Sequence, residues 1–192
     1  TTEIYTLSLH DALPIYHEQN VRYRKKPLFL SRSVFIALPK ESGTTECELH
    51  RTISLMSHIT KLMLRILMLR IRRNIRPEIS DVQCGFMEGK GTTNAIFVIR
   101  NMCERSIEVQ RDLYLCFIDY PNAFDKVQHE KLFAILNELD TDGKTLRWIR
   151  NLYWDQTAAV RVHNKLSNWM KIERGVRQGC VLSPDLFSLY RL

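Results

Sequence analysis

An aspartate directly follows a short apolar run near the middle of this 192-residue chain. Residues 113–118 (LYLCFI) carry leucine, isoleucine and aromatic side chains and no charge, which predicts a strand buried on both faces. Asp119 would then stand at the end of that strand, where a carboxylate is costly unless a cation, a metal ion or solvent meets it. The residues alone leave two roles open: Asp119 binds a metal or ligand, or it caps the strand end and the following turn.

Pro121 and Asn122 break the predicted strand, and residues 123–127 begin a helical pattern. Asp125, the second carboxylate, has the position of a helix-start residue that interacts with free backbone N–H groups.

The other residues that could do chemistry lack the spacing of common ligand sets. The five cysteines contain no C-x-x-C pair, which argues against a disulfide framework or a zinc knuckle and favours reduced thiols. The six histidines show no ligand spacing either. The run at 85–92 (GFMEGKGT) misses the phosphate-binding P-loop pattern, which needs four residues before Gly-Lys and a serine or threonine directly after the lysine.

Composition indicates an ordinary globular protein with an anionic partner. Hydrophobic residues make up 45% and charged residues 26% of the chain, and the net charge is +7. A basic balance favours a partner such as nucleic acid, although many solvated surfaces are equally basic. No run of about 18 uncharged apolar residues occurs, so we expect no membrane span.

Apolar spacing predicts the elements that must position these residues. Helices are predicted at 57–76, 92–110, 126–139 and 144–154, a strand at 34–40, and a hairpin from strands at 158–162 and 169–172. In the first helix, Ile59, Leu62, Met63, Ile66 and Leu67 share one face, and Leu64, Met68 and Ile71 widen it. The opposite side of this helix carries a basic stripe made of Lys61, Arg65, Arg72 and Arg76. The residues leave three roles open for the stripe: a solvated face, a surface that follows a phosphate backbone, or the polar face of a membrane-surface helix.

Two motifs, in the expected order, resemble the reverse transcriptases of non-LTR (LINE-type) retrotransposons. F-x-D-x-x-x-A-F-D at 117–125 resembles their first catalytic motif, and RGVRQGCVLSP at 174–184 resembles their second palm motif, G-x-x-Q-G-x-x-x-S-P. The run at 83–92 resembles the Q-x-G-F-x-x-G-x-x-T motif that lies along the template strand. The resemblance covers residues 34–190.

The resemblance implies an α+β fold made of the fingers and palm subdomains of a right-hand polymerase, truncated before the third palm motif and the thumb. Residues 21–112 are expected to form a fingers-like region and residues 113–192 a partial palm. Residues 1–20 match nothing in the family, and residues 3–15 look like translated sequencing-adapter sequence, so we expect a non-native leader.

The implied activity is RNA-directed DNA synthesis by two-metal nucleotidyl transfer, with Mg²⁺ or Mn²⁺ in the complete active site. Asp119 is implied as the catalytic metal ligand, with the backbone carbonyl of Tyr120 beside it. The implied nucleotide-binding residues are Lys40, Arg51, Phe124, Gln178 and Gly179, with Phe124 as the steric gate against a ribose 2′-hydroxyl. The implied template-binding residues are Gln83, Gly85, Phe86 and Lys90. An RNA template, a DNA primer and deoxynucleoside triphosphates are the implied partners, and the parent element is expected in a cytoplasmic ribonucleoprotein and the nucleus.

The sequence departs from the family pattern in one decisive place. The aromatic-x-Asp-Asp motif that supplies the remaining metal carboxylates does not occur, so we expect a fragment that is inactive by itself. Smaller departures are Thr52 for proline, Met87 for arginine, and Pro121-Asn122 for the common Thr/Glu-Lys pair. The alternatives are a non-catalytic, basic nucleic-acid-binding remnant or a decayed element without activity. For Lys40 and Arg51, the alternative to triphosphate binding is that they are surface cations.

Overall fold

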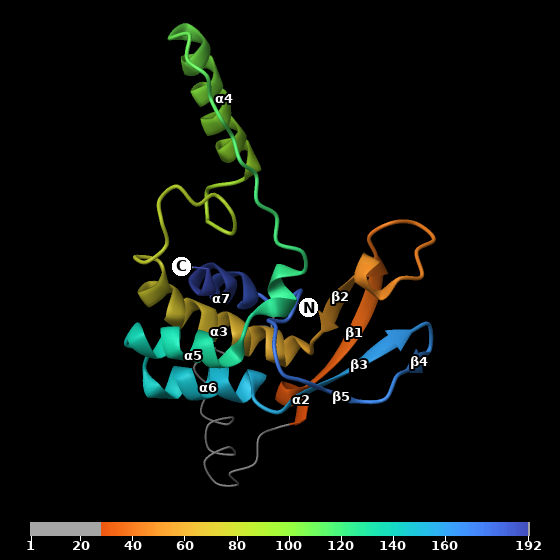
Figure 1. The fold of residues 1–192 in the computed structure, drawn as a ribbon. Helices are drawn as coiled ribbons and strands as arrows, with labels where there is room; N and C mark the ends of the chain where they lie inside the picture. Colours follow the sequence, from red (N-terminus) through yellow and green to blue (C-terminus); the bar gives the residue numbers. More distant parts are fainter. Residues whose placement is uncertain (1–27, 192) are drawn as a thin grey trace, which may run out of the picture.

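The computed structural model describes residues 28–191 (Figure 1). The predicted leader at 1–20 lies outside the described residues. The first half contains α2 (Leu28–Ser31), β1 (Arg32–Pro39), the short 3-10 helix η1 (Cys47–Leu49), β2 (His50–Leu55), α3 (His58–Ile75) and α4 (Thr92–Glu108). The second half contains the 3-10 helix η2 (Ala123–Lys126), α5 (His129–Glu138), α6 (Gly143–Tyr153), β3 (Gln156–Val162), β4 (Lys165–Leu166), β5 (Met170–Ile172) and α7 (Ser183–Tyr190).

One mixed sheet joins strands from both halves of the chain. Its order is β2-β1-β3-β4, and β5 also pairs with β3. β1 runs antiparallel to β2, with Val34 opposite Leu55, and parallel to β3, with Arg32 opposite Thr157. The predicted strand at 34–40 and the predicted hairpin are confirmed, and the parallel β1–β3 pairing crosses the expected boundary between residues 112 and 113.

The helices α3, α5, α6 and α7 pack together beside the sheet and form the main core (Figure 1). Apolar side chains from all four helices close this core, including Leu64, Leu67 and Ile71 of α3, Leu132 and Leu136 of α5, Ile149 and Leu152 of α6, and Leu186 and Leu189 of α7. The predicted helices at 57–76, 126–139 and 144–154 are confirmed with small shifts at their ends. In the described part of the chain, no helix is both long and apolar enough to cross a membrane.

The predicted apolar face of α3 is only partly correct. Ile59 and Leu62 are 53% and 56% exposed, whereas the buried face contains Thr60, Leu64, Leu67, Met68, Ile71 and Ile75. The helix is apolar around more than half of its circumference, so spacing alone does not select one stripe. The packing of α6 and α7 against α3 selects the stripe that includes Leu64 and Ile71.

The predicted buried strand at 113–118 is wrong in this structure. Residues 111–120 have no regular secondary structure and are all exposed, with Tyr114 at 87% and Phe117 at 79%. A strand is held by hydrogen bonds to a neighbouring strand, and none of β1–β5 pairs with this segment. The preceding helix α4, predicted at 92–110, projects from the body in Figure 1 and buries none of its side chains.

Candidate nucleotide and nucleic-acid site

The turn after Asp119 and the loop after β5 contact each other directly. The backbone N–H of Gly175 donates to the carbonyl of Val127 at 2.7 Å, and the N–H of Val176 donates to the carbonyl of Phe124 at 2.8 Å. Gly175 has a φ of +97°, and a Cβ there would lie 3.1 Å from both Cα and O of Asp125. Glycine therefore permits both the left-handed backbone and the close approach.

The side chain of Gln178 extends this contact. Its Nε2 donates to the Asp125 carboxylate at 3.1 Å and 3.3 Å, and the backbone carbonyl of Gln178 accepts from the backbone N–H of Ser54 on β2 at 2.9 Å. Gly179 has a φ of +87°, and a Cβ at this position would contact Cγ2 of Ile53 at 3.4 Å. The loop thus lies against β2 on one side and the Asp125 turn on the other.

Lys40 joins the end of β1 to the same turn. Its Nζ donates to Oδ1 of Asn122 at 3.1 Å and to the carbonyl of Glu48 at 3.0 Å. Arg51 lies on β2 opposite Leu38, and its exposed side chain makes no hydrogen bond or ion pair within residues 28–191. The two cations implied for a triphosphate are therefore both exposed, Lys40 directly after β1 and Arg51 on the neighbouring strand β2.

Asp119 itself is exposed and makes no hydrogen bond or ion pair with another described residue. Tyr120 beside it is 64% exposed. Asp119 is thus open to solvent rather than enclosed by apolar side chains.

The ring of Phe124 is held between two other rings. It stacks on Phe187 of α7 with a centroid distance of 4.8 Å, and it meets Phe86 edge-on at 5.9 Å. Offset-stacked and edge-to-face geometries are the favoured ones for aromatic pairs. The sequence interpretation missed Phe187, for which an apolar position on α7 was the available signal.

The loop at 83–90, which contains the residues implied for template binding, is hydrogen-bonded to the C-terminal end of α7. Nε2 of Gln83 donates to Oγ of Ser188 at 3.0 Å, and Oε1 of Gln83 accepts from Nη2 of Arg191 at 2.7 Å. Nζ of Lys90 donates to the carbonyl of Asp81. A cleft between this loop, α4 and α7 is lined by residues that include Gln83, Gly85, Phe86, Lys90, Asn94 and Phe187.

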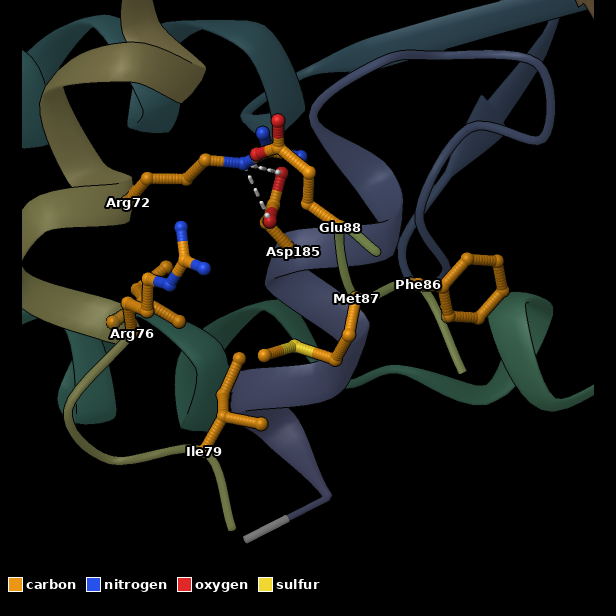
Figure 2. A pocket seen from close by; sticks show the side chains of 8 residues that line it. Arg72, Arg76, Ile79, Phe86, Met87, Glu88 and Asp185 are labelled. Atoms are coloured by element: carbon orange, nitrogen blue, oxygen red, sulfur yellow. Dashed lines mark hydrogen bonds and ion pairs between the residues drawn. The ribbon is translucent and has the colours of Figure 1, made fainter. Parts of the chain in front are cut away.

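A smaller pocket between α3 and α7 is lined in part by Met87, one of the departures from the family pattern (Figure 2). Nε of Arg72 donates to both oxygens of Asp185, at 3.1 Å and 3.3 Å, and Met87 packs against the core below them near Ile79. Burial raises the pKa of Asp185, and Arg72 acts in the opposite direction. Because Asp185 holds Arg72, the predicted basic stripe of α3 loses this member.

Two buried side chains, His129 and Arg177, hold the 175–179 loop in place through hydrogen bonds to backbone carbonyls. Nε2–H of His129 donates to the carbonyl of Gly175 at 2.8 Å, and burial lowers the pKa of this imidazole. Arg177 is only 3% exposed, and its Nη2 donates to the carbonyls of Leu30 and Leu152 at 2.5 Å and 3.1 Å. Burial lowers the pKa of this guanidinium as well. Neither role follows from local spacing, because the partners lie far away in the chain.

Comparison with known proteins identifies the family. The profile described as "Reverse transcriptase (RNA-dependent DNA polymerase)" matches residues 38–191. The chain belongs to the reverse transcriptase family. The matched range contains all the residues implied for nucleotide and template binding.

Relatives confirm the resemblance to reverse transcriptases of non-LTR retrotransposons. The chain is 27% identical to the transposon TX1 uncharacterized 149 kDa protein of Xenopus laevis, over 92% of its own length. It is 28% identical to the Pol polyprotein from the type-1 retrotransposable element R2 of Nasonia vitripennis, over 82% of its length. It is 30% identical to the probable RNA-directed DNA polymerase from transposon BS of Drosophila melanogaster, over 79% of its length. The chain spans only 14–16% of the length of these relatives.

Reverse transcriptases generally use divalent metal ions. Residues 28–191 contain no group of three or more histidine, cysteine, aspartate or glutamate side chains that could hold a metal ion. Asp125 accepts from Gln178, whereas Asp119 is exposed and makes no hydrogen bond with another described residue. All five cysteines lie in the described range and are free.

Proposed function

We propose that this chain supplies part of the nucleotide-binding and template-binding site of an RNA-directed DNA polymerase encoded by a non-LTR retrotransposon. The observation that carries the proposal is the convergence of three segments that are far apart in sequence. Lys40 is hydrogen-bonded to Asn122, and the turn that follows, at Asp125, is hydrogen-bonded to Gln178.

In this proposal Lys40 and Arg51 bind the triphosphate of an incoming deoxynucleotide. One exposed cation directly after β1 and another on the neighbouring strand β2 suit a polyanion. Phe124, fixed by its two ring contacts, acts as the steric gate against a ribose 2′-hydroxyl, and Gln178 and Gly179 pack on the nucleotide. The ring contacts support a gate because a fixed ring cannot swing away from a larger sugar.

Asp119 supplies one metal carboxylate in the complete enzyme, with the carbonyl of Tyr120 beside it. Divalent cations in such a site activate a hydroxyl nucleophile and stabilise the leaving oxygen. The aromatic-x-Asp-Asp motif that would supply the other carboxylates does not occur in this sequence, so we expect this chain by itself to be inactive in polymerisation.

The template strand is proposed to pass along the loop at 83–90. Gly85, Phe86 and Lys90 are exposed there, and Phe86 offers a ring on which a base can stack. Gln83 has a different part in this proposal: its amide is engaged by Ser188 and Arg191, so it positions the loop.

The test is RNA-templated primer extension with Mg²⁺, using the longest open reading frame that contains this chain. We expect Asp119→Asn to reduce extension to background, because a metal carboxylate is lost. Asp112→Asn, an exposed aspartate in the same segment, is the matched control and should keep the wild-type rate. Full activity of the Asp119→Asn variant would contradict the proposal, and extension by the 192-residue chain alone would contradict the expected inactivity.

A second candidate function, binding of nucleic acid without catalysis, is favoured by the surface of α3. Lys61 and Arg65 are exposed on this helix and Arg76 is exposed at its C-cap, whereas Arg72 is held by Asp185. Replacing the three exposed cations by glutamine should lower the salt slope of RNA binding by about 0.7 for each phosphate that is no longer neutralised. Asp119→Asn should leave this binding unchanged, and an unaltered salt slope would exclude α3 as the binding surface.

A further inference from the structure

Asn122 occupies an unusual backbone position in the turn between Asp119 and Asp125. Its φ is +54°, and its carbonyl accepts from the N–H of Asp125 at 3.0 Å. Asparagine tolerates this left-handed conformation better than most residues. The family motif that residues 117–125 resemble commonly has lysine at this position, whereas this chain has asparagine.

Asn122 presents its amide oxygen to Lys40. A lysine side chain is flexible, and its ammonium has three donors. Two of them are used by Oδ1 of Asn122 and the carbonyl of Glu48, which lie on different segments. Both acceptors are neutral, so they orient the ammonium without cancelling its charge, and one N–H is left for another acceptor.

We propose that Asn122 is a positioning residue that holds the Lys40 ammonium over the Asp119–Asp125 turn, where its remaining N–H donates to a phosphate oxygen of the incoming nucleotide. This inference rests on the proposed nucleotide site. It assigns Asn122 a part in triphosphate binding through Lys40, without direct contact to the reacting atoms. An aspartate here would also orient Lys40, but its charge would repel the triphosphate.

The first test detects the contact in solution by NMR of the ¹⁵N-labelled 192-residue chain. Lys40→Met should shift the side-chain amide signals of Asn122, because the charged donor at its Oδ1 is removed. Lys61→Met, on the exposed face of α3, should leave these signals in place. Unshifted Asn122 signals in Lys40→Met would overturn the proposal.

The second test titrates the same chain with dATP and excess Mg²⁺ and follows binding by NMR. Asn122→Ala should weaken binding about three- to tenfold. In this variant the Lys40 side chain is ordered only when dATP binds, and the entropy lost on ordering lowers the affinity. Asn122→Asp should weaken it further, through repulsion of the phosphates. Asn137→Ala, an exposed asparagine of α5, should bind as the wild type.

The variants separate failure of this inference from failure of the nucleotide site. If Lys40→Met weakens dATP binding and Asn122→Ala does not, the positioning role of Asn122 is overturned and the nucleotide site stands. If Lys40→Met binds dATP like the wild type, or the wild type itself does not bind, the proposed nucleotide role of Lys40 fails together with the inference.

Discussion

The side-chain amide of Gln178 donates to both carboxylate oxygens of Asp125, a residue 53 positions earlier in the chain. This pair joins the two motifs whose sequences indicated the family. The backbone hydrogen bonds of Gly175 and Val176 to the same turn make the junction continuous. A substitution at this junction should therefore change both the free energy of unfolding and binding at the proposed nucleotide site.

Gly175 should tolerate a side chain poorly. Gly175→Ala combines a positive φ with a Cβ at 3.1 Å from the backbone of Asp125, so we expect a loss of about 2–4 kcal/mol in the free energy of unfolding. Gly43→Ala is the matched control, because Gly43 also has a positive φ but no heavy atom within 4 Å of its Cβ position. The control should lose only about 1–2 kcal/mol. Urea denaturation measures both, and equal losses would show that the close contact is absent.

The ion pair between Arg72 of α3 and Asp185 of α7 should affect stability mainly because Asp185 is buried. Arg72→Met leaves the buried carboxylate of Asp185 without its donor and should cost about 2–3 kcal/mol of unfolding free energy. Adding Asp185→Asn to this variant should restore part of the loss, because the unpaired charge is removed. A double-mutant cycle in urea measures the coupling, and strictly additive losses would contradict it.

His129 should make stability depend on pH. The pKa of its imidazole in the folded chain is below the ordinary value of 6.5, mainly because of burial. As the pH falls through 6.5, the unfolded chain takes up a proton that the folded chain does not, so stability decreases. His129→Gln keeps a donor for Gly175 but does not titrate, and it should lose less stability than the wild type between pH 7.5 and 5.5. His58→Gln, at an exposed histidine of α3, should lose as much as the wild type.

The exposed apolar side chains of α4 and residues 113–118 should bind a hydrophobic dye. Ile107 is 76% exposed and Phe117 is 79% exposed. The double variant Ile107→Glu and Phe117→Glu should bind less of the fluorescent dye ANS than the wild type. Its urea midpoint should stay unchanged, because neither side chain belongs to the core. Unchanged dye fluorescence would indicate that this region is covered in solution.

Most elements of the fold could be predicted from local pattern. The predicted helix at 57–76 is α3 at His58–Ile75, and the predicted hairpin is present as β3 and β5. The motifs at 117–125 and 174–184 were sufficient to indicate the reverse transcriptase family. These features depend only on residue types and spacings within a short segment, so they can be recognised without knowing which distant segments are neighbours in space.

Burial and contact depended on the tertiary structure. Residues 113–118 have the composition of a buried strand, yet no described strand pairs with them, and they stay exposed. The links from Lys40 to Asn122 and from His129 to Gly175 join segments that no local pattern relates. The sequence by itself thus determined which segments become helices and which motifs are present. Only the tertiary structure decided which faces are covered and which side chains meet, because both depend on segments that are distant in the chain but neighbours in space.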